Sequence, residues 1–114
     1  MKYLMLIAVD PASRPADRAA GEKLMAEYGA FTDGITGSGE LVAADRLAGA
    51  DTATCVRVRD GKTVFTDGPF AETTEQLGGF YVIDVPNLDR ALELAAQIPN
   101  ARDGVVEVRP IAAS

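Results

Sequence analysis

The residues best suited to chemistry are concentrated in one stretch, Thr66–Tyr81, which lies between two strand-like segments. It contains the carboxylates Asp67, Glu72 and Glu75, several hydroxyl groups including the Tyr81 phenol, and the glycine pair Gly78-Gly79. Carboxylates and phenols can transfer protons and can hold polar ligands. No signature in the stretch identifies a reaction, so it predicts a site and leaves the substrate open.

The same residues also have ordinary structural uses. In Asp67-Gly68-Pro69-Phe70, aspartate can start a turn, proline can fix φ, glycine can relieve crowding and phenylalanine can anchor the loop in the core. Gly78-Gly79 can form a β-bulge or allow a close backbone approach at the start of a strand. Glu72 and Glu75 can be solvated loop carboxylates. The residues alone leave both interpretations open.

Composition argues against several function classes. Seventeen acidic and eleven basic residues leave a net charge of −6, which repels a phosphate backbone, so we expect no direct binding to nucleic acid. The chain has no histidine and one cysteine, Cys55, which removes the commonest general base, the familiar zinc sites and any intrachain disulfide. Because Cys55 lies in a strand-like run, we expect a buried structural thiol rather than a nucleophile. We expect no metal ion and no cofactor.

Length and hydropathy predict a single globular domain over residues 1–114. The composition, 47% hydrophobic and 25% charged, is ordinary for a protein with its own core. The longest apolar run, Leu4–Val9, is too short to span a bilayer, and no signal-peptide pattern precedes it. We therefore expect a cytoplasmic protein without membrane association.

The first half of the chain predicts a strand, a helix and a second strand. The strand Lys2–Val9 is ended by Asp10-Pro11, and Pro15 suits the first turn of a helix that Gly37-Ser38-Gly39 ends. One helical face is apolar because its members recur at helical spacing: Leu24, Tyr28, Phe31 and Ile35. Glu40–Leu47 predicts the second strand.

Three glycines, Gly21, Gly29 and Gly34, lie inside this predicted helix. Each costs roughly 1 kcal/mol of helix stability relative to alanine, so a compensating contact is expected. Close packing against another backbone is the favoured compensation, and contact with a ligand is the alternative.

The second half predicts a hairpin, a strand, a helix and a last strand. Asp60-Gly61 suits a two-residue type I′ turn, in a register that sets Val56 opposite Phe65. Strand Phe80–Val85 is followed by Asn87 as a helix cap, and Val105–Arg109 forms the last strand. The helix between them is predicted to bury a stripe against the sheet: Leu88, Ala91, Leu92, Ala95 and Ile98.

This order of elements predicts an α+β fold, a ferredoxin-like βαββαβ sandwich with an extra β-hairpin. Right-handed crossovers place both helices on one face of the sheet. The other face then needs a cover if it is apolar, and a second copy of the chain is the simplest one. We therefore expect a homodimer.

Several of these motifs resemble the YCII-related family, in its branch named for the Asp-Gly-Pro-Phe motif. The resemblance rests on Asp67-Gly68-Pro69-Phe70 with Ala71-Glu72-Thr73, on Glu75-Gln76-Leu77-Gly78-Gly79, on strand Phe80–Val85 and on the ending Val106–Pro110, with Lys2-Tyr3 and Tyr28–Phe31 similar too. It implies a dimeric α+β barrel. Members are mostly uncharacterised, and some relatives occur joined to or beside extracytoplasmic-function sigma factors.

The resemblance also suggests site residues. Some members of the wider group carry a histidine-aspartate pair, which this chain lacks because it has no histidine. From the family motif and general chemistry, Asp67 is the expected catalytic carboxylate, Tyr81 the proton donor and Arg109 an orienting cation. The expected ligand-binding residues are Asp67, Gly68, Pro69, Phe70, Glu72, Gly79 and Arg109.

Three function hypotheses follow from these residues. The first is small-molecule binding in a cleft between the 67–79 loop and the sheet. The second is a non-catalytic regulatory module associated with sigma factors. The third is an enzyme that uses carboxylate acid/base chemistry, so catalysis stays open.

Overall fold

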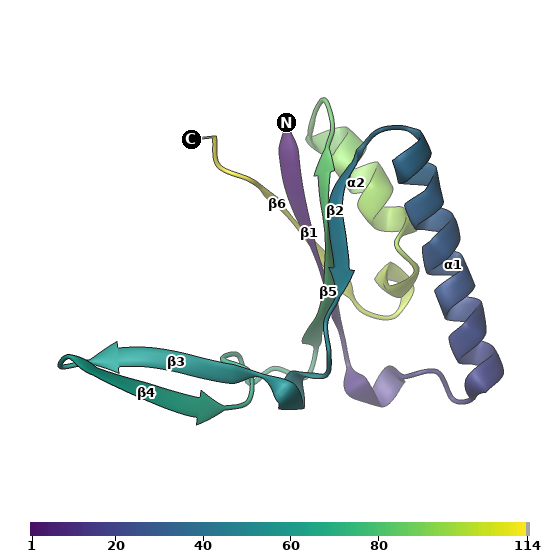
Figure 1. Ribbon diagram of the computed structural model, residues 1–114. Helices are drawn as coiled ribbons and strands as arrows, with labels where there is room; N and C mark the ends of the chain where they lie inside the picture. Colours follow the sequence, from purple (N-terminus) through teal and green to yellow (C-terminus); the bar gives the residue numbers. More distant parts are fainter. Residues whose placement is uncertain (114) are drawn as a thin grey trace.

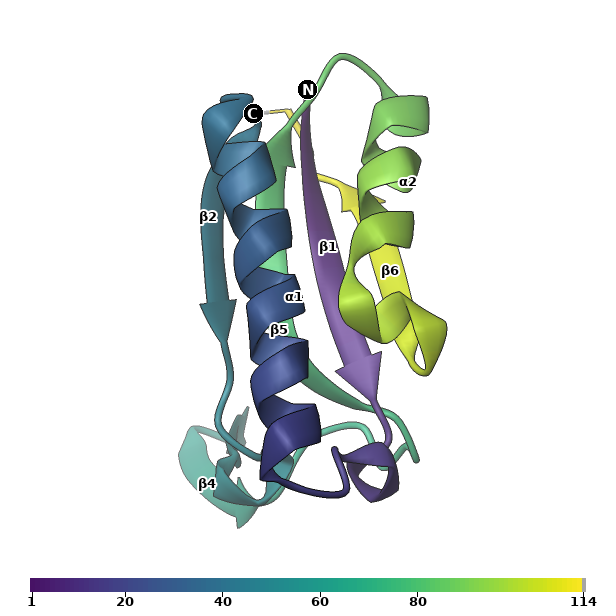
Figure 2. The same ribbon diagram turned by 90° about the vertical axis from the view of Figure 1, so that its right-hand side faces the viewer.

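A computed structural model describes residues 1–113. Over this range the elements are β1 (Lys2–Val9), α1 (Arg18–Gly37), β2 (Leu41–Arg46), β3 (Thr54–Arg59), β4 (Lys62–Asp67), β5 (Gln76–Asp84), α2 (Leu88–Gln97) and β6 (Val105–Pro110), with 3-10 turns at Pro11–Ser13, Ala50–Thr52 and Pro99–Arg102. One antiparallel sheet has the order β2-β5-β1-β6, and β3 pairs with β4 alone. Both helices lie on one face of the sheet (Figures 1 and 2). The predicted ferredoxin-like sandwich with an extra hairpin is confirmed.

The core lies between the sheet and the two helices. Tyr3, Met5 and Ile7 of β1 are buried there, as are Tyr81 and Ile83 of β5. α1 adds Phe31 and Ile35, with Tyr28 partly buried beside them, which confirms the predicted apolar face of this helix. The four-stranded sheet and the two helices thus bury a hydrophobic core within a single chain.

The opposite face of the sheet carries no helix, and we call it the open face. Leu4 and Leu6 alternate with the buried positions of β1 and pair across the strands with Val82 and Phe80. All four side chains are half-buried. Beside them on β6, Arg109 pairs with Glu107 at 2.7 Å between Nη2 and Oε2. The open face therefore has an apolar centre flanked by an exposed ion pair.

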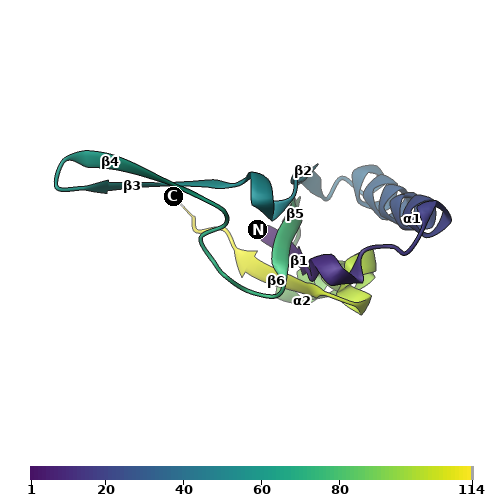
Figure 3. The same cartoon turned by 90° about the horizontal axis from the view of Figure 1, so that it is seen from below.

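The hairpin Thr54–Asp67, which we call the arm, projects away from the sheet on the side opposite to the helices (Figures 1 and 3). Asp60 and Gly61 have φ angles of 52° and 73°, as a type I′ turn requires. Val56 pairs with Phe65 as predicted. The arm makes the chain extended, with a radius of gyration of 16.1 Å against about 13 Å for a compact domain of similar length.

The two helices differ from prediction at their boundaries and in the face they bury. α1 begins at Arg18 because the Asp17 side chain accepts the Ala20 N–H at 2.8 Å, so Pro15 precedes the helix instead of lying in its first turn. α2 is capped by Asn87 as predicted. It buries Ala91, Leu94 and Ala95, followed by Ile98, whereas Leu88 and Leu92 are nearly half exposed. The predicted stripe was wrong there because the apolar positions extend around more of the helix than the sheet covers.

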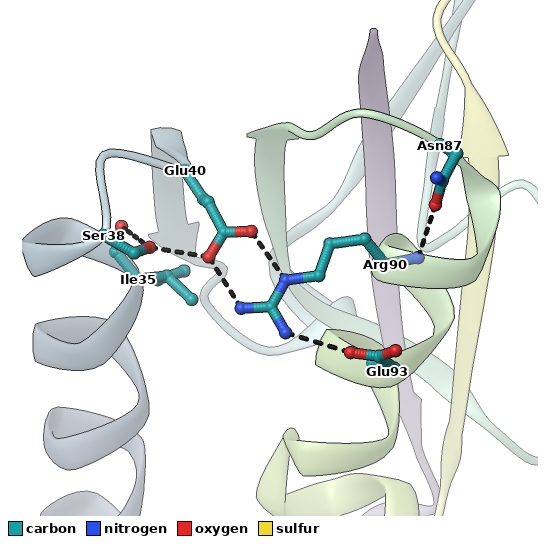
Figure 4. A network of polar contacts seen from close by, with 6 residues as sticks. All are labelled: Ile35, Ser38, Glu40, Asn87, Arg90 and Glu93. Carbon is teal, nitrogen blue, oxygen red and sulfur yellow. Dashed lines mark hydrogen bonds and ion pairs between the residues drawn. The ribbon is translucent and has the colours of Figure 1, made fainter.

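A polar network ties the end of α1 to α2 (Figure 4). Arg90 donates to both carboxylate oxygens of Glu40, at 2.8 and 2.9 Å, and to Glu93 at 3.0 Å. Ser38 donates to Glu40 at 2.6 Å. These hydrogen bonds, first those from Arg90 and then that from Ser38, lower the pKa of Glu40 to about 2. The network helps to hold both helices on the same face of the sheet.

Among the described helices, none has the length and apolar character needed to cross a membrane.

Candidate functional site

A large hollow lies between α1 and the sheet, and we call it the groove. Its volume is about 1070 Å³, large enough for a small organic ligand. α1 forms one wall with Leu24, Met25, Tyr28, Gly29 and Thr32, and the other wall comes from the ends of β1 and β2 and the start of β5. The lining is mainly apolar, so the polar groups in it are well placed to orient a ligand.

Glycines help to keep the groove open. At Gly29 and Gly34 of α1, an added Cβ would meet nothing within 4 Å. The predicted close packing at these two positions is therefore wrong, and Gly29 instead lines the groove. On the opposite wall, Gly78 is the extra residue where the β1–β5 register shifts, as the bulge prediction required. A Cβ at Gly79 would approach the Asp45 carbonyl oxygen to 3.1 Å.

A pair of hydroxyl groups joins the two walls of the groove. The Tyr81 OH and the Thr32 Oγ1 lie 2.7 Å apart, and either can be the donor. Tyr81 is buried and packs edge-to-face on Phe31, with ring centroids 5.2 Å apart. The ring packing fixes the direction of the phenol, so the pair can offer a ligand a donor or an acceptor at a set position.

A second phenol, that of Tyr28, also lines the groove. Tyr28 donates to the Asn100 Oδ1 at 2.6 Å. Burial raises the pKa of Tyr28 to about 12, so this group stays protonated near neutral pH and serves as a donor. It is already committed to Asn100, which makes it part of the wall.

Charged residues also line the groove: Arg14, Asp33, Asp45 and Arg46, of which Asp45 pairs with Phe80 and so has its side chain on the open face. Within residues 1–113, none of the four belongs to an ion pair. Arg46 on β2 instead approaches the Met25 sulfur of α1, with Nη1 and Sδ 3.7 Å apart. The two arginines and Asp33 can therefore interact with the polar ends of a ligand.

The Asp67 motif lies outside the groove, at the base of the arm. Asp67 ends β4 opposite Thr54. Gly68 has a φ of 92°, a conformation that glycine adopts without the steric penalty of a Cβ. Its N–H donates to the Ala53 carbonyl oxygen at 2.8 Å. Phe70 is 83% exposed, so the structural interpretation in which it anchors the loop in the core is wrong. Its ring lies 5.9 Å from the Arg57 guanidinium carbon.

Other sequence-predicted residues lie on three separate surfaces. Tyr81 and Gly79 line the groove on the helix side. The turn Asp67–Phe70 and the exposed Glu72 lie between the arm and β5. Arg109 lies on the open face, paired with Glu107. The chain thus brings together Tyr81 and Gly79, and it does not bring Asp67 or Arg109 into the groove.

Sequence reasoning missed Thr32 and Asn100. Thr32 could have been predicted from the sequence, because it follows Tyr28 by one helical turn and so lies on the same face of α1. Asn100 could not have been predicted in this way, because its position depends on how the turn after α2 packs on α1. Cys55 is half-buried on the arm, where its thiol donates to the Gly68 carbonyl oxygen at 3.2 Å, so it is less buried than the predicted structural thiol. Within residues 1–113, no group of three or more side chains could hold a metal ion.

Comparison with known proteins gives one family, one relative in sequence and one solved structure of similar fold. The family model described as the YCII-related domain matches residues 1–113. The chain is 38% identical over 115 residues to "Uncharacterized protein R00369" of Rhizobium meliloti (strain 1021), covering 98% of this chain and 93% of that protein.

A solved structure is similar in fold. It is 5-chloro-2-hydroxyhydroquinone dehydrochlorinase (TftG) from Burkholderia phenoliruptrix AC1100, in complex with 2,5-dihydroxybenzoquinone. The TM-score is 0.56 at 14% identity, covering 100% of this chain and 96% of that chain. TftG has the dimeric α+β barrel fold, which confirms the predicted fold class.

Proposed function

We propose that this chain, which belongs to the YCII-related family as the match over residues 1–113 shows, is a small-molecule-binding protein whose ligand occupies the groove. The proposal revises the location expected from the sequence. Of the predicted 67–79 loop, the segment Gln76–Gly79 lines the groove. The regulatory alternative, a module beside sigma factors, stays a prediction.

The observation that carries the proposal is the Tyr81–Thr32 hydroxyl pair inside an apolar groove. Ligand sites are typically apolar hollows with a few convergent polar groups, and here a phenol held by ring packing meets a threonine at 2.7 Å. A ring compound with a carbonyl or hydroxyl group would place its apolar faces against the walls and its oxygen at this pair. The unpaired charges of the groove would meet further polar substituents.

Catalysis is a narrower proposal. Of the two residues expected to be catalytic, Tyr81 reaches the groove and can donate a proton to a bound oxygen. Asp67 belongs to the base of the arm, so a shared reaction would need a conformational change or a second copy. Replacing Asp67 by Asn keeps the turn chemistry and tests its role in turnover separately from binding.

The binding test uses 2,5-dihydroxybenzoquinone and simple phenols as probes, measured by thermal shift and calorimetry. A ligand that binds only the native state raises its melting temperature. Tyr81→Phe keeps the ring and removes the hydroxyl group, so we expect affinity to fall by about threefold to tenfold. A Cys55→Ser background prevents covalent reaction of the quinone with the thiol.

Tyr3→Phe is the matched control. Tyr3 is equally buried on the same sheet face, outside the groove, and its OH contacts the Met1 sulfur at 3.4 Å. We expect this variant to bind like the wild type. The proposal fails if no probe stabilises the protein, or if both tyrosine variants lose affinity equally.

We also propose that the protein is a homodimer joined through the open face. Leu4, Leu6, Phe80 and Val82 form an apolar centre there that no helix covers, and TftG provides a dimeric precedent for the fold. Burial of this face against a second copy would contribute about 25 cal/mol per Å² of apolar surface, which offsets part of the entropy lost on association. Light scattering at micromolar concentration tests this. A mass near twice 12.0 kDa supports the homodimer, and a stable monomer overturns it.

A further inference from the structure

The arm lacks the cover that a two-stranded hairpin usually needs. An isolated hairpin is marginally stable in water at best, and this one extends away from the sheet and the helices (Figure 3). Val56, Val58 and Phe65 are all more than half exposed. A sequence with so many β-branched and aromatic residues on a thin projection leaves apolar surface to be buried by something outside the protomer.

We propose that the arm is a clamp that packs its Val56–Val58–Phe65 face on a second copy of the chain. This deepens the proposed function because it rests on the homodimer and adds a second contact surface to the open face. A stable homodimer joined through the open face alone would leave the arm exposed, so the two proposals can be separated.

The two faces of the arm differ in chemistry. Side chains alternate along paired strands, so Val56 and Val58 share one face with Phe65, which pairs with Val56. Arg57 pairs with Val64 and Arg59 with Lys62 on the other face. Arg57 also donates to Thr66 at 3.0 Å and lies near the Phe70 ring. The apolar face therefore suits a protein surface, and the basic face suits water or an acidic rim.

The position of the arm favours a copy of this chain as the occupant. The arm and the open face lie on the same side of the sheet (Figure 1), so one partner can contact both. In a two-fold dimer the same pair of surfaces is present on each copy, and every contact is made twice. The three apolar arm residues can add a few hundred Å² of buried surface per protomer, an amount typical of two or three large side chains.

Charge favours the same occupant. The arm carries Arg57, Arg59 and Lys62 against Asp60 and Asp67, a net charge of +1, so the rest of a chain of net charge −6 carries −7. An arm that lies over the acidic body of another copy is therefore attracted to it, and it offsets the repulsion between two acidic bodies.

The test compares Val58→Asp with Val64→Asp. Both positions are exposed, both changes add one negative charge to the same hairpin, and the two side chains lie on opposite faces of the arm. Sedimentation over a dilution series measures the dimer dissociation constant. We expect Val58→Asp to raise it at least about tenfold, because a carboxylate would be buried against the partner, and Val64→Asp to change it less than about threefold.

Hydrogen exchange on the same samples gives a second readout. We expect the amide hydrogens of residues 54–67 to be slower to exchange in the wild-type dimer than in the Val58→Asp protein, while those of β1 and β5 stay protected in both. Equal effects of the two substitutions on the dissociation constant, or equal arm exchange, overturn the clamp.

Each failure has its own signature. A dimer that Val58→Asp leaves intact overturns the clamp and leaves the open-face homodimer standing. A monomeric wild type overturns both. Binding of 2,5-dihydroxybenzoquinone and of the phenols is followed in parallel, and the absence of binding by every probe overturns the groove proposal alone, because the groove lies on the helix side of the sheet.

Discussion

β1 in the body and β3 in the arm are both built from strand-forming residues, yet their side chains meet opposite environments. Met5 of β1 is fully buried between the sheet and the helices, whereas Val58 of β3 is 61% exposed. Both strands pair in antiparallel registers, which the bulge at Gly78 interrupts for β1 and nothing interrupts for β3. The difference shows that strand pairing and side-chain burial are specified separately: pairing by the strand and its turn, burial by the elements that arrive from elsewhere.

The body and the arm therefore differ in what stabilises them. The body forms its own core, so core substitutions should destabilise it strongly. The arm depends on its turn and on whatever covers it, so substitutions there should change local order or association first. Four predictions test this division, from the largest expected effect to the smallest.

The largest effect is expected from Ile83→Ala in the body. Ile83 is fully buried on β5, and its truncation should lower the free energy of unfolding by about 2–5 kcal/mol through lost burial and a cavity. Val64→Ala is the counterpart on the arm and should cost less than about 0.5 kcal/mol, because Val64 is exposed. Denaturant unfolding at one fixed protein concentration measures both. Similar losses for the two variants would remove the distinction between body and arm.

Gly104→Ala should produce the next largest effect. An added Cβ would collide with the Ala8 carbonyl oxygen and come within 3.1 Å of the Asn100 carbonyl oxygen. Backbone atoms cannot move aside cheaply, so we expect a loss of about 1–3 kcal/mol in unfolding free energy. Gly34→Ala is the control, since it has open space around it and should stabilise α1. A neutral Gly104→Ala would mean that β1 and the turn before β6 are less tightly packed than described.

Glu40→Gln tests the network that joins the two helices of the body. The pKa of Glu40 is lowered from 4.5 to about 2 in the folded state, so its charge stabilises the fold above pH 4.5, and this contribution is lost as pH falls towards 2. After discounting for solvent screening, we expect a loss of about 1–2 kcal/mol at neutral pH.

The pH dependence provides the check on Glu40→Gln. Unfolding curves of the two proteins should converge as pH falls from 4.5 towards 2, because the wild-type carboxyl becomes neutral too. Glu93→Gln is the control, since Glu93 is exposed and contacts Arg90 through one hydrogen bond, and its effect should be smaller. A difference that persists unchanged at low pH would show that charge is not its cause.

The smallest effect is expected from Gly61→Ala in the arm. Gly61 has a φ of 73°, and a Cβ in this region costs about 1 kcal/mol. The cost should be confined to the arm, so hydrogen exchange should become faster at residues 54–67 and stay unchanged in β1 and β5. Faster exchange throughout the sheet would mean that arm and body unfold together.

Local signals in the sequence determined much of the chain. Asp60-Gly61 determined the hairpin turn and the pairing of Val56 with Phe65, Asn87 determined the start of α2, and Gly78-Gly79 marked the bulge in β5. These features depend on the backbone preferences of a few adjacent residues, so a sequence is sufficient to predict them. The order of elements then allowed the ferredoxin-like topology to be predicted.

Tertiary structure decided which apolar residues are buried and where the groove lies. β1 is apolar on both faces, and α2 is apolar around more than one face, so only the arriving elements determine that Met5 and Leu94 are buried while Leu92 stays partly exposed. The residues of the site were also decided by tertiary structure. Tyr81 was predicted, but its neighbour Thr32 comes from α1, and Asp67 lies at the end of β4 in the arm, outside the groove. Burial and site geometry depend on contacts between distant segments, and those contacts exist only once the chain has folded.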